Sequence, residues 1–143
     1  PIMEERFKNW KKPVIRHGQF TKWKWIVYYP EKLKLGKKID IGAFSYLNCL
    51  NEIVIEDYVQ IGGGVKIYSS DTISNKNGMI ILRKNCKIGA NSVILPNTEI
   101  GENSVIGACS VVPYGMKIPP NQIWSGSPLK QIGIIKNGER IYN

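Results

Sequence analysis

The chain has 143 residues, enough for one domain, and twenty basic against eleven acidic side chains give it a net charge of +9. No apolar run is long enough to span a bilayer and the charged beginning does not resemble a secretory signal, so we expect a cytoplasmic protein without a transmembrane segment. Three cysteines, a single histidine and the lack of a Cys-x-x-Cys pair argue against a disulfide framework and predict that there is no metal site.

Residues 1–34 differ in composition from the rest of the chain. Residues 1–38 hold eleven basic and three acidic side chains (+8), which leaves +1 for residues 39–143. We predict a short helix at about Met3–Trp10 and then an extended arm that covers the domain or a neighbouring subunit. The lysines between aromatic residues would suit nucleic acid, an anionic substrate or an acidic membrane surface. They also suit a solvated face whose lysine stems cover an apolar cap, and we expect no nucleic-acid partner.

A six-residue spacing of aliphatic residues runs through residues 35–130. Its members are Ile41, Leu47 and Ile53; then, two residues out of step, Ile55, Ile61 and Ile67; then Leu82, Ile88, Ile94, Ile100, Ile106 and Val112. In the last run the fourth residue after an aliphatic one is small: Cys86, Ser92, Thr98, Ser104 and Ser110. Neither an α-helix nor a flat strand has this period. It predicts an all-β solenoid of five to six coils, each made of three six-residue blocks whose side chains stack inside a narrow prism.

Two segments depart from this period. Residues 71–81 are polar and contain the turn signal Asn77-Gly78, so we predict a loop that leaves one corner of the coil before the repeat resumes at Met79–Leu82. Residues 131–143 contain two short β-like runs around Asn137-Gly138 and predict a β-hairpin that caps the C-terminal end.

Three segments resemble the hexapeptide-repeat acyltransferases, which are left-handed parallel β-helices. They are Ile88-Gly89-Ala90-Asn91-Ser92-Val93-Ile94-Leu95-Pro96, Ile100-Gly101-Glu102-Asn103-Ser104-Val105-Ile106-Gly107-Ala108 and Gly126-Ser127-Pro128-Leu129-Lys130. The resemblance implies a homotrimer that uses acetyl-CoA in grooves between subunits. It also implies that Gly89, Ala90, Gly107 and Ala108 line the pantetheine arm and that Lys130 meets the phosphates of the coenzyme.

The expected catalytic base is missing from the matching position. Many members of this family have a histidine directly after the segment that matches Ile67–Asp71, whereas this chain has Thr72. A sugar hydroxyl needs a base to attack a thioester. Asp71 or His17 could replace the histidine, a different arrangement with Asn75 or Lys76 could act on a hydroxyl, an amine acceptor could need no strong base, or activity could be lost.

The acceptor is suggested only by resemblance. Asn48 lies thirteen residues before Ile61, the spacing at which sugar O-acetyltransferases carry an asparagine facing the acceptor; it also fits a structural asparagine at a corner. The stretch Thr72–Lys76 resembles acyltransferases of surface-sugar biosynthesis. We therefore expect acetylation, on oxygen or nitrogen, of a nucleotide-linked or surface-polysaccharide sugar, with a sialic-acid-like sugar as one candidate. The alternative is a non-catalytic trimeric scaffold. A carbonic anhydrase of the same fold is excluded, because it needs three histidines.

Overall fold

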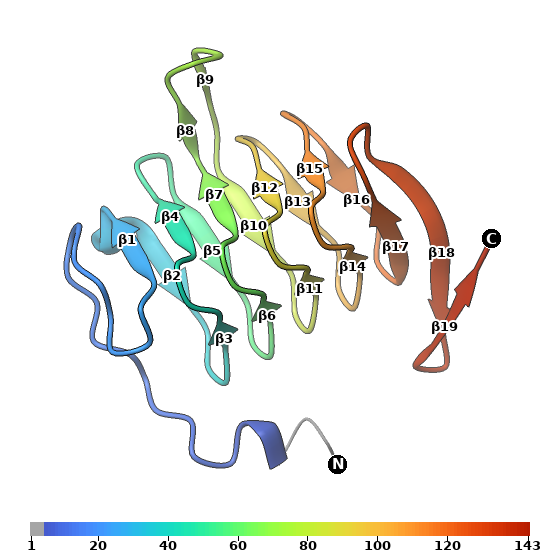
Figure 1. Ribbon diagram of the computed structural model, residues 1–143, viewed down its shortest axis with the longest axis horizontal. Helices are drawn as coiled ribbons and strands as arrows, with labels where there is room; N and C mark the ends of the chain where they lie inside the picture. Colours follow the sequence, from blue (N-terminus) through green and yellow to red (C-terminus); the bar gives the residue numbers. More distant parts are fainter. Residues whose placement is uncertain (1–4) are drawn as a thin grey trace.

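A computed structural model describes residues 5–143 and shows a β-helix whose coils carry three parallel sheets (Figure 1). Sheet A contains β1 (Ile26–Tyr28), β4 (Tyr46–Asn48), β7 (Lys66–Tyr68), β12 (Val93–Ile94) and β15 (Val111–Val112). Sheet B contains β2 (Leu33–Leu35), β5 (Ile53–Ile55), β10 (Ile80–Leu82), β13 (Glu99–Ile100) and β16 (Lys117–Ile118). Sheet C contains β3 (Asp40–Ile41), β6 (Gln60–Ile61), β11 (Lys87–Ile88), β14 (Val105–Ile106) and β17 (Gln122–Ser125), and ends with β18 (Lys130–Lys136) and β19 (Glu139–Tyr142). The predicted all-β solenoid is confirmed.

The length of each coil explains the breaks in the sequence period. Eighteen residues separate Val93 from its partner Val111, which is three blocks of six. Twenty residues separate Tyr46 from Lys66, and this accounts for the two-residue shift in the earlier coils. The coil from Lys66 to Val93 takes twenty-seven residues because it also carries the extra loop.

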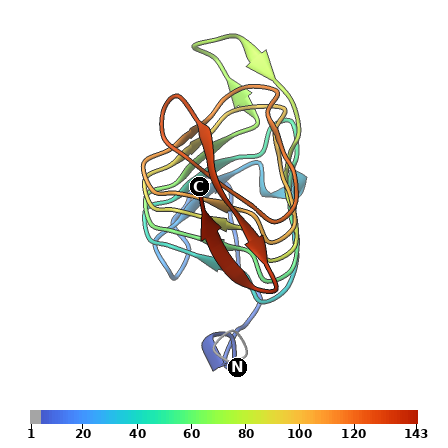
Figure 2. The ribbon, with the colours of Figure 1, turned by 90° about the vertical axis from the view of Figure 1, so that its right-hand side faces the viewer.

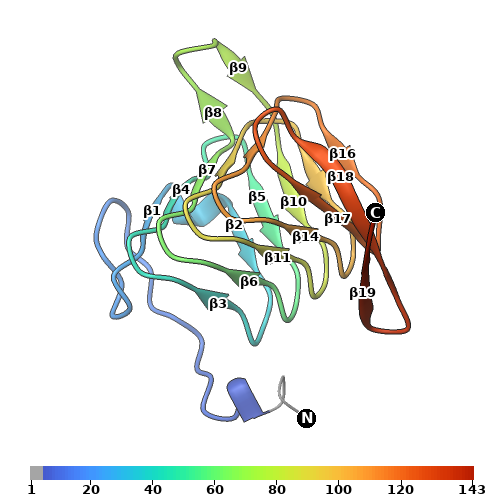
Figure 3. The same cartoon turned by 45° about the vertical axis from the view of Figure 1, so that its right-hand side comes forward.

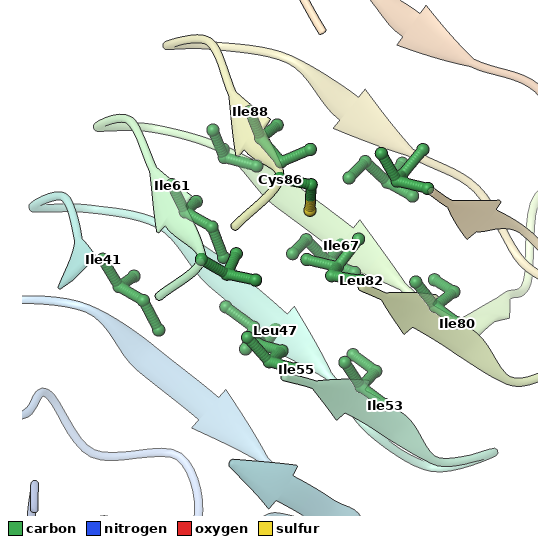
Figure 4. Close-up of a cluster of buried hydrophobic side chains, with 14 of the residues drawn as sticks. Ile41, Leu47, Ile53, Ile55, Ile61, Ile67, Ile80, Leu82, Cys86 and Ile88 are labelled. Atoms are coloured by element: carbon green, nitrogen blue, oxygen red, sulfur yellow. The ribbon is translucent and has the colours of Figure 1, made fainter. Parts of the chain in front are cut away.

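The aliphatic stripe fills the interior of the prism. Leu82, Ile94, Ile100, Ile106 and Val112 have no exposed surface, and Ile88 is 2% exposed. Figure 4 shows the aliphatic side chains of successive coils pointing into the same interior. Their burial is the main stabilising contribution, since a fully buried aliphatic side chain contributes about 1.5–3 kcal/mol.

The small stripe fills the space that remains, and its hydroxyl groups are satisfied. Ser92 and Ser110 both donate to the carbonyl of Gly107, at 3.0 and 2.7 Å, and Ser104 donates to the carbonyl of Pro119 at 2.6 Å. The bonds from Ser92 and Ser104 tie neighbouring coils together, and all three remove the cost of burying the hydroxyl groups. Cys86 makes no such bond and packs as a small apolar side chain, as predicted from its place in the stripe.

The sequence suggests that the coil begins at residue 35, but in the structure it begins earlier. β1 lies within residues 1–34 and β2 begins there, and the two strands pair in parallel with β4 and β5. The 3-10 turn η1 (Pro30–Lys32) joins them. The period was hidden there because this first coil also repeats at twenty residues and carries aromatic side chains on its outer face.

The segment before the coil lies along its first turn. The Trp10 indole N–H donates to the carbonyl of Ile39 at 2.8 Å, Arg6 pairs with Asp40, and Phe7 is buried against the Tyr58 ring. Met3, where the predicted helix begins, lies outside the described residues; residues 5–6 are helical, and residues 7–9 continue as hydrogen-bonded turns. The arm therefore packs on the same chain over the stretch that the structure describes.

The C-terminal hairpin closes the opposite end. β18 pairs antiparallel with β17 and then with β19, and the turn lies at Asn137-Gly138, as predicted. Figure 2, a view along the coil, shows this hairpin crossing the end of the prism. In the described part of the chain, no helix has the length and apolar character needed to cross a bilayer.

Candidate functional site

A column of glycines lies at the corner where sheet C passes into sheet A. Its members directly follow the paired residues Ile41, Ile61, Ile88 and Ile106, and they are Gly42, Gly62, Gly89 and Gly107. A Cβ atom on Gly89 would lie 2.6 Å from the Cα of Ala108 in the next coil, which is closer than such atoms approach. Glycine is required here because the backbones of successive coils come close together. The corner is therefore narrow and presents main chain at its surface.

A cavity of about 340 Å³ runs along the outer face of sheet C beside this column. Its lining includes Gly89, Gly107 and Ala108 with Lys87 and Arg140. Burial, and then the nearby Arg140, lowers the pKa of Lys87 from its usual value. The ion pairs recorded among the described residues include neither of these two cations. The same cavity is lined by the Arg6–Asp40 ion pair, so Lys87 and Arg140 give its lining an excess of positive charge that suits an anion.

The other predicted coenzyme residues lie near this corner. Ala90 follows Gly89 and is half-buried. Lys130 is exposed at the start of β18 and is paired in register with Ser125, which continues the glycine column one coil further. The structure thus places all five predicted coenzyme residues along one corner of the coil.

The extra loop is a β-hairpin that projects from the corner between sheets A and B (Figures 1 and 3). Its strands are β8 (Ser70–Asp71) and β9 (Lys76–Asn77), and its turn spans residues 72–75. The turn signal Asn77-Gly78 therefore did not mark the turn itself. It is Asn75 that takes the left-handed conformation, with φ of 57°, and the Asn77-Gly78 pair returns the chain to the coil.

Asp71 organises the tip of this hairpin. One carboxylate oxygen accepts the Ile73 backbone N–H at 3.1 Å, and the other accepts the Ser74 hydroxyl at 2.7 Å. The side chains of Thr72 and Asn75 are exposed beside it. Lys76 is paired in register with Asp71 beside this turn, and its ammonium lies 5.1 Å from the centre of the Tyr114 ring, which holds the hairpin over the coils that follow.

Asn48 lies on the outer face of sheet A, one coil before the hairpin. Its Oδ1 atom accepts the Leu50 backbone N–H at 3.1 Å, so half of the amide stabilises the local turn. In the ladder it is paired with Tyr28 on one side and with Tyr68 on the other. Because Tyr68 comes two residues before β8, Asn48 and the hairpin belong to the same edge of sheet A.

His17 approaches the same face from the arm. Its Nδ1 atom accepts the Tyr29 backbone N–H at 2.9 Å, and its ring packs edge-on against Tyr28 and Tyr29, with centroids 5.1 and 4.9 Å apart. A neutral imidazole that accepts at Nδ1 carries its proton on Nε2. In this arrangement His17 presents an N–H donor, and it would have to give up the bond from Tyr29 to accept a proton at Nδ1.

Comparison with known proteins relates this geometry to a family. The profile described as "Bacterial transferase hexapeptide (six repeats)" matches residues 79–113. The galactoside O-acetyltransferase of Escherichia coli K12 is 36% identical over 129 residues, which cover 79% of this chain and 62% of that protein. The chain is therefore similar to hexapeptide-repeat acyltransferases over most of its length.

Solved structures of similar fold include two acyltransferases. A maltose O-acetyltransferase from Clostridium difficile 630 has a TM-score of 0.68 and 27% identity, with 80% of this chain and 65% of that chain covered. The N-acyltransferase AntD from Bacillus cereus, in complex with dTDP and 3-hydroxybutyryl-CoA, has a TM-score of 0.62 and 26% identity, with 82% and 79% covered. The chain thus spans about three fifths of the length of its Escherichia coli relative, and more of AntD.

Sequence reasoning missed two features of this hexapeptide-repeat protein. Lys87 and Arg140 are fifty-three residues apart, and only the folding of the C-terminal hairpin brings both to one cavity. The tyrosines on the outer face of sheet A come from three separate coils, and no local spacing links them in the sequence. In residues 5–143 no group of three or more histidine, cysteine, aspartate or glutamate side chains could hold a metal ion.

Proposed function

We propose that the protein transfers an acetyl group from acetyl-CoA to a sugar in a groove between two subunits of a homotrimer. The observation that carries this proposal is the cavity beside the glycine column, where small residues lie next to Lys87 and Arg140. A pantetheine arm needs close access to main chain, and the phosphates of the coenzyme need cations. Both requirements are met at one corner, and family members of the same fold are described as acting on acyl-CoA and sugars.

The separation of the two residue sets supports a site shared between subunits. Gly89, Gly107 and Lys130 lie at the corner between sheets C and A, whereas Asp71 and Thr72 lie beyond the other edge of sheet A. One chain therefore does not join its coenzyme residues to its hairpin. In a trimer, the hairpin of one subunit would face the glycine column of its neighbour and complete the site.

The reaction requires a nucleophile, an acyl donor and a route for one proton. The acceptor oxygen or nitrogen attacks the thioester carbonyl, the carbon–sulfur bond breaks, and the proton lost by the acceptor ends on the departing thiol. Asp71 is the better-placed candidate base, because its carboxylate lies at the hairpin tip beside Thr72. His17 would first need to release its bond from Tyr29. An amine acceptor that binds as the free base would reduce the need for either group.

Calorimetric titration with acetyl-CoA tests the proposal directly. We expect saturable binding in this titration. We also expect a solution mass of about three chains. When a sugar or amino-sugar acceptor is added, free coenzyme A thiol should be released. Arg140→Gln should weaken acetyl-CoA binding by about ten- to a hundredfold, since a charge-assisted contact contributes roughly 1.5–3 kcal/mol. Absence of binding at millimolar acetyl-CoA, with the protein folded, would instead favour the non-catalytic scaffold.

Variants of the two candidate bases then distinguish the routes for the proton. Asp71→Asn should lower turnover on a hydroxyl acceptor by about 10²-fold or more if Asp71 is the base. His17→Gln should leave turnover within a few fold under the same mechanism. The reverse order of effects would assign the proton transfer to His17, and small effects of both would favour an amine acceptor.

A further inference from the structure

Four aromatic rings form a continuous row on the outer face of sheet A. The ring centroids are 5.1 Å apart for His17 and Tyr28, 5.5 Å for Tyr28 and Tyr46, and 5.3 Å for Tyr46 and Tyr68. The row, here called the tyrosine strip, runs parallel to the coil axis because β1, β4 and β7 are adjacent in the sheet. All three tyrosines are half-buried and lie side by side, so each ring keeps part of its surface exposed.

The strip also presents unused hydrogen-bond donors. Among the described residues, no hydrogen bond is recorded for the hydroxyl groups of Tyr28, Tyr46 and Tyr68. Burial, then Tyr46 and Asp71, raises the pKa of Tyr68 from its ordinary value, which keeps its hydroxyl protonated. The Oδ1 atom of Asn48 is already bonded, so the free part of this amide is its NH2 group. The strip thus combines flat apolar surface with donors at its edges.

We propose that the tyrosine strip binds the saccharide acceptor; this rests on the acyl-transfer function proposed above and names the surface that selects the sugar. A pyranose ring has an apolar face of C–H groups that packs on an aromatic ring, and its hydroxyl oxygens accept hydrogen bonds at the rim. Tyr28, Tyr46, Tyr68 and Asn48 offer this combination along three successive coils. The length of the row suits a chain of linked sugar units or a sugar with a further ring attached.

Other occupants fit the strip less well. An apolar peptide or lipid would leave the phenol hydroxyls and the Asn48 amide without partners, which is costly once water is excluded. A phosphate or nucleic-acid backbone would meet the carboxylate of Asp71 at one end. Lys66, a cation on the strand that carries Tyr68, already donates to the carbonyl of Gly64 at 2.8 Å.

The position of the strip agrees with its use as an acceptor site. Tyr68 is followed after one residue by β8, so the strip ends at the hairpin that carries Asp71 and Thr72. A sugar stacked on Tyr68 would have a hydroxyl or amine near the tip of the same hairpin. The remaining rings would then hold the part of the acceptor that does not react and would set its length and orientation.

Saturation-transfer NMR with maltose, galactose and glucosamine tests the proposal on the full chain, with acetyl-CoA binding measured in parallel. We expect at least one of these sugars to bind, and Tyr46→Ala to weaken that binding by about tenfold, because loss of an aromatic stacking partner typically costs of order 1 kcal/mol or more. Tyr46→Phe should weaken it by about two- to fivefold, since stacking remains and one donor is lost. Tyr142→Ala is the matched control, because this exposed tyrosine lies on the C-terminal hairpin.

The possible outcomes separate this inference from the acyl-transfer proposal. Acetyl-CoA binding that survives in every variant, with sugar binding weakened only in the Tyr46 variants, supports the strip. Acetyl-CoA binding without any sugar binding, or sugar binding that Tyr46→Phe and Tyr46→Ala leave unchanged, overturns it. A smaller solution mass of the Tyr46 variants with unchanged sugar binding would also overturn it and would identify the strip as a contact between copies. Sugar binding that depends on Tyr46 without acetyl-CoA binding would retain the strip and refute acyl transfer.

Discussion

Leu82 and Ile81 provide a matched test of the packing inside the coil. Leu82 points inward with no exposed surface and is paired in register with Ile55 and Ile100 in the adjacent coils. Ile81 precedes it on the same strand and points outward, half-buried. Replacing either residue by alanine removes three carbon atoms, so the two variants differ mainly in what surrounds the deleted atoms.

The expected cost follows from this environment. Three buried carbons contribute about 2.4 kcal/mol at about 0.8 kcal/mol each. The cavity adds to this loss, because the coils above and below are held at a fixed spacing by ladder hydrogen bonds and collapse poorly. We therefore expect Leu82→Ala to reduce the free energy of unfolding by about 3–5 kcal/mol, and Ile81→Ala by about 1 kcal/mol.

Thermal unfolding followed by circular dichroism measures both variants. Chain concentration must be equal in all samples, since association of copies would itself stabilise the fold. Leu82→Ala should lower Tm by about 10 °C, and Ile81→Ala by only a few degrees. Equal losses, or a loss below about 1 kcal/mol for Leu82→Ala, would refute the assignment of the six-residue stripe to a packed interior.

Three further predictions concern the corners and the cysteines. Gly89→Ala should cost about 1–3 kcal/mol in chemical denaturation, because the new methyl group would overlap the backbone at Ala108; a neutral effect would show that the coils separate easily. Asn103→Ala should lower the free energy of unfolding by about 1–3 kcal/mol, because the side chain of Asn103 is bonded to the asparagines of both adjacent coils and its backbone has a φ of 64°. Asn103→Gly should recover the part of this loss that is due to backbone strain. A thiol reagent at pH 8 should label exposed Cys109 in the native protein and Cys49 only after unfolding. The reason is that burial raises the pKa of Cys49 to about 12 and leaves almost no thiolate at pH 8. Rapid labelling of Cys49 in the native protein, detected by mass spectrometry, would contradict its burial.

Much of the fold followed from the sequence because its information is local and periodic. An aliphatic residue at every sixth position has only one compact solution, in which short strands stack their inward side chains, and Leu82 to Val112 lie in that interior as predicted. The C-terminal hairpin was predicted from its own turn residues. The start of the coil was misplaced, because β1 and β2 follow a twenty-residue repeat that the aromatic outer face obscures.

Sequence alone determined the class of the chain and the corner that carries the predicted coenzyme residues, because both depend on residue types repeated at fixed spacing. Only the tertiary structure decided which distant residues meet. It brought Lys87 and Arg140 to one cavity and aligned His17 with three tyrosines from separate coils. It also placed the hairpin and the glycine column at different corners. These contacts depend on coil length and on how the two ends of the chain fold back, and no local pattern encodes either.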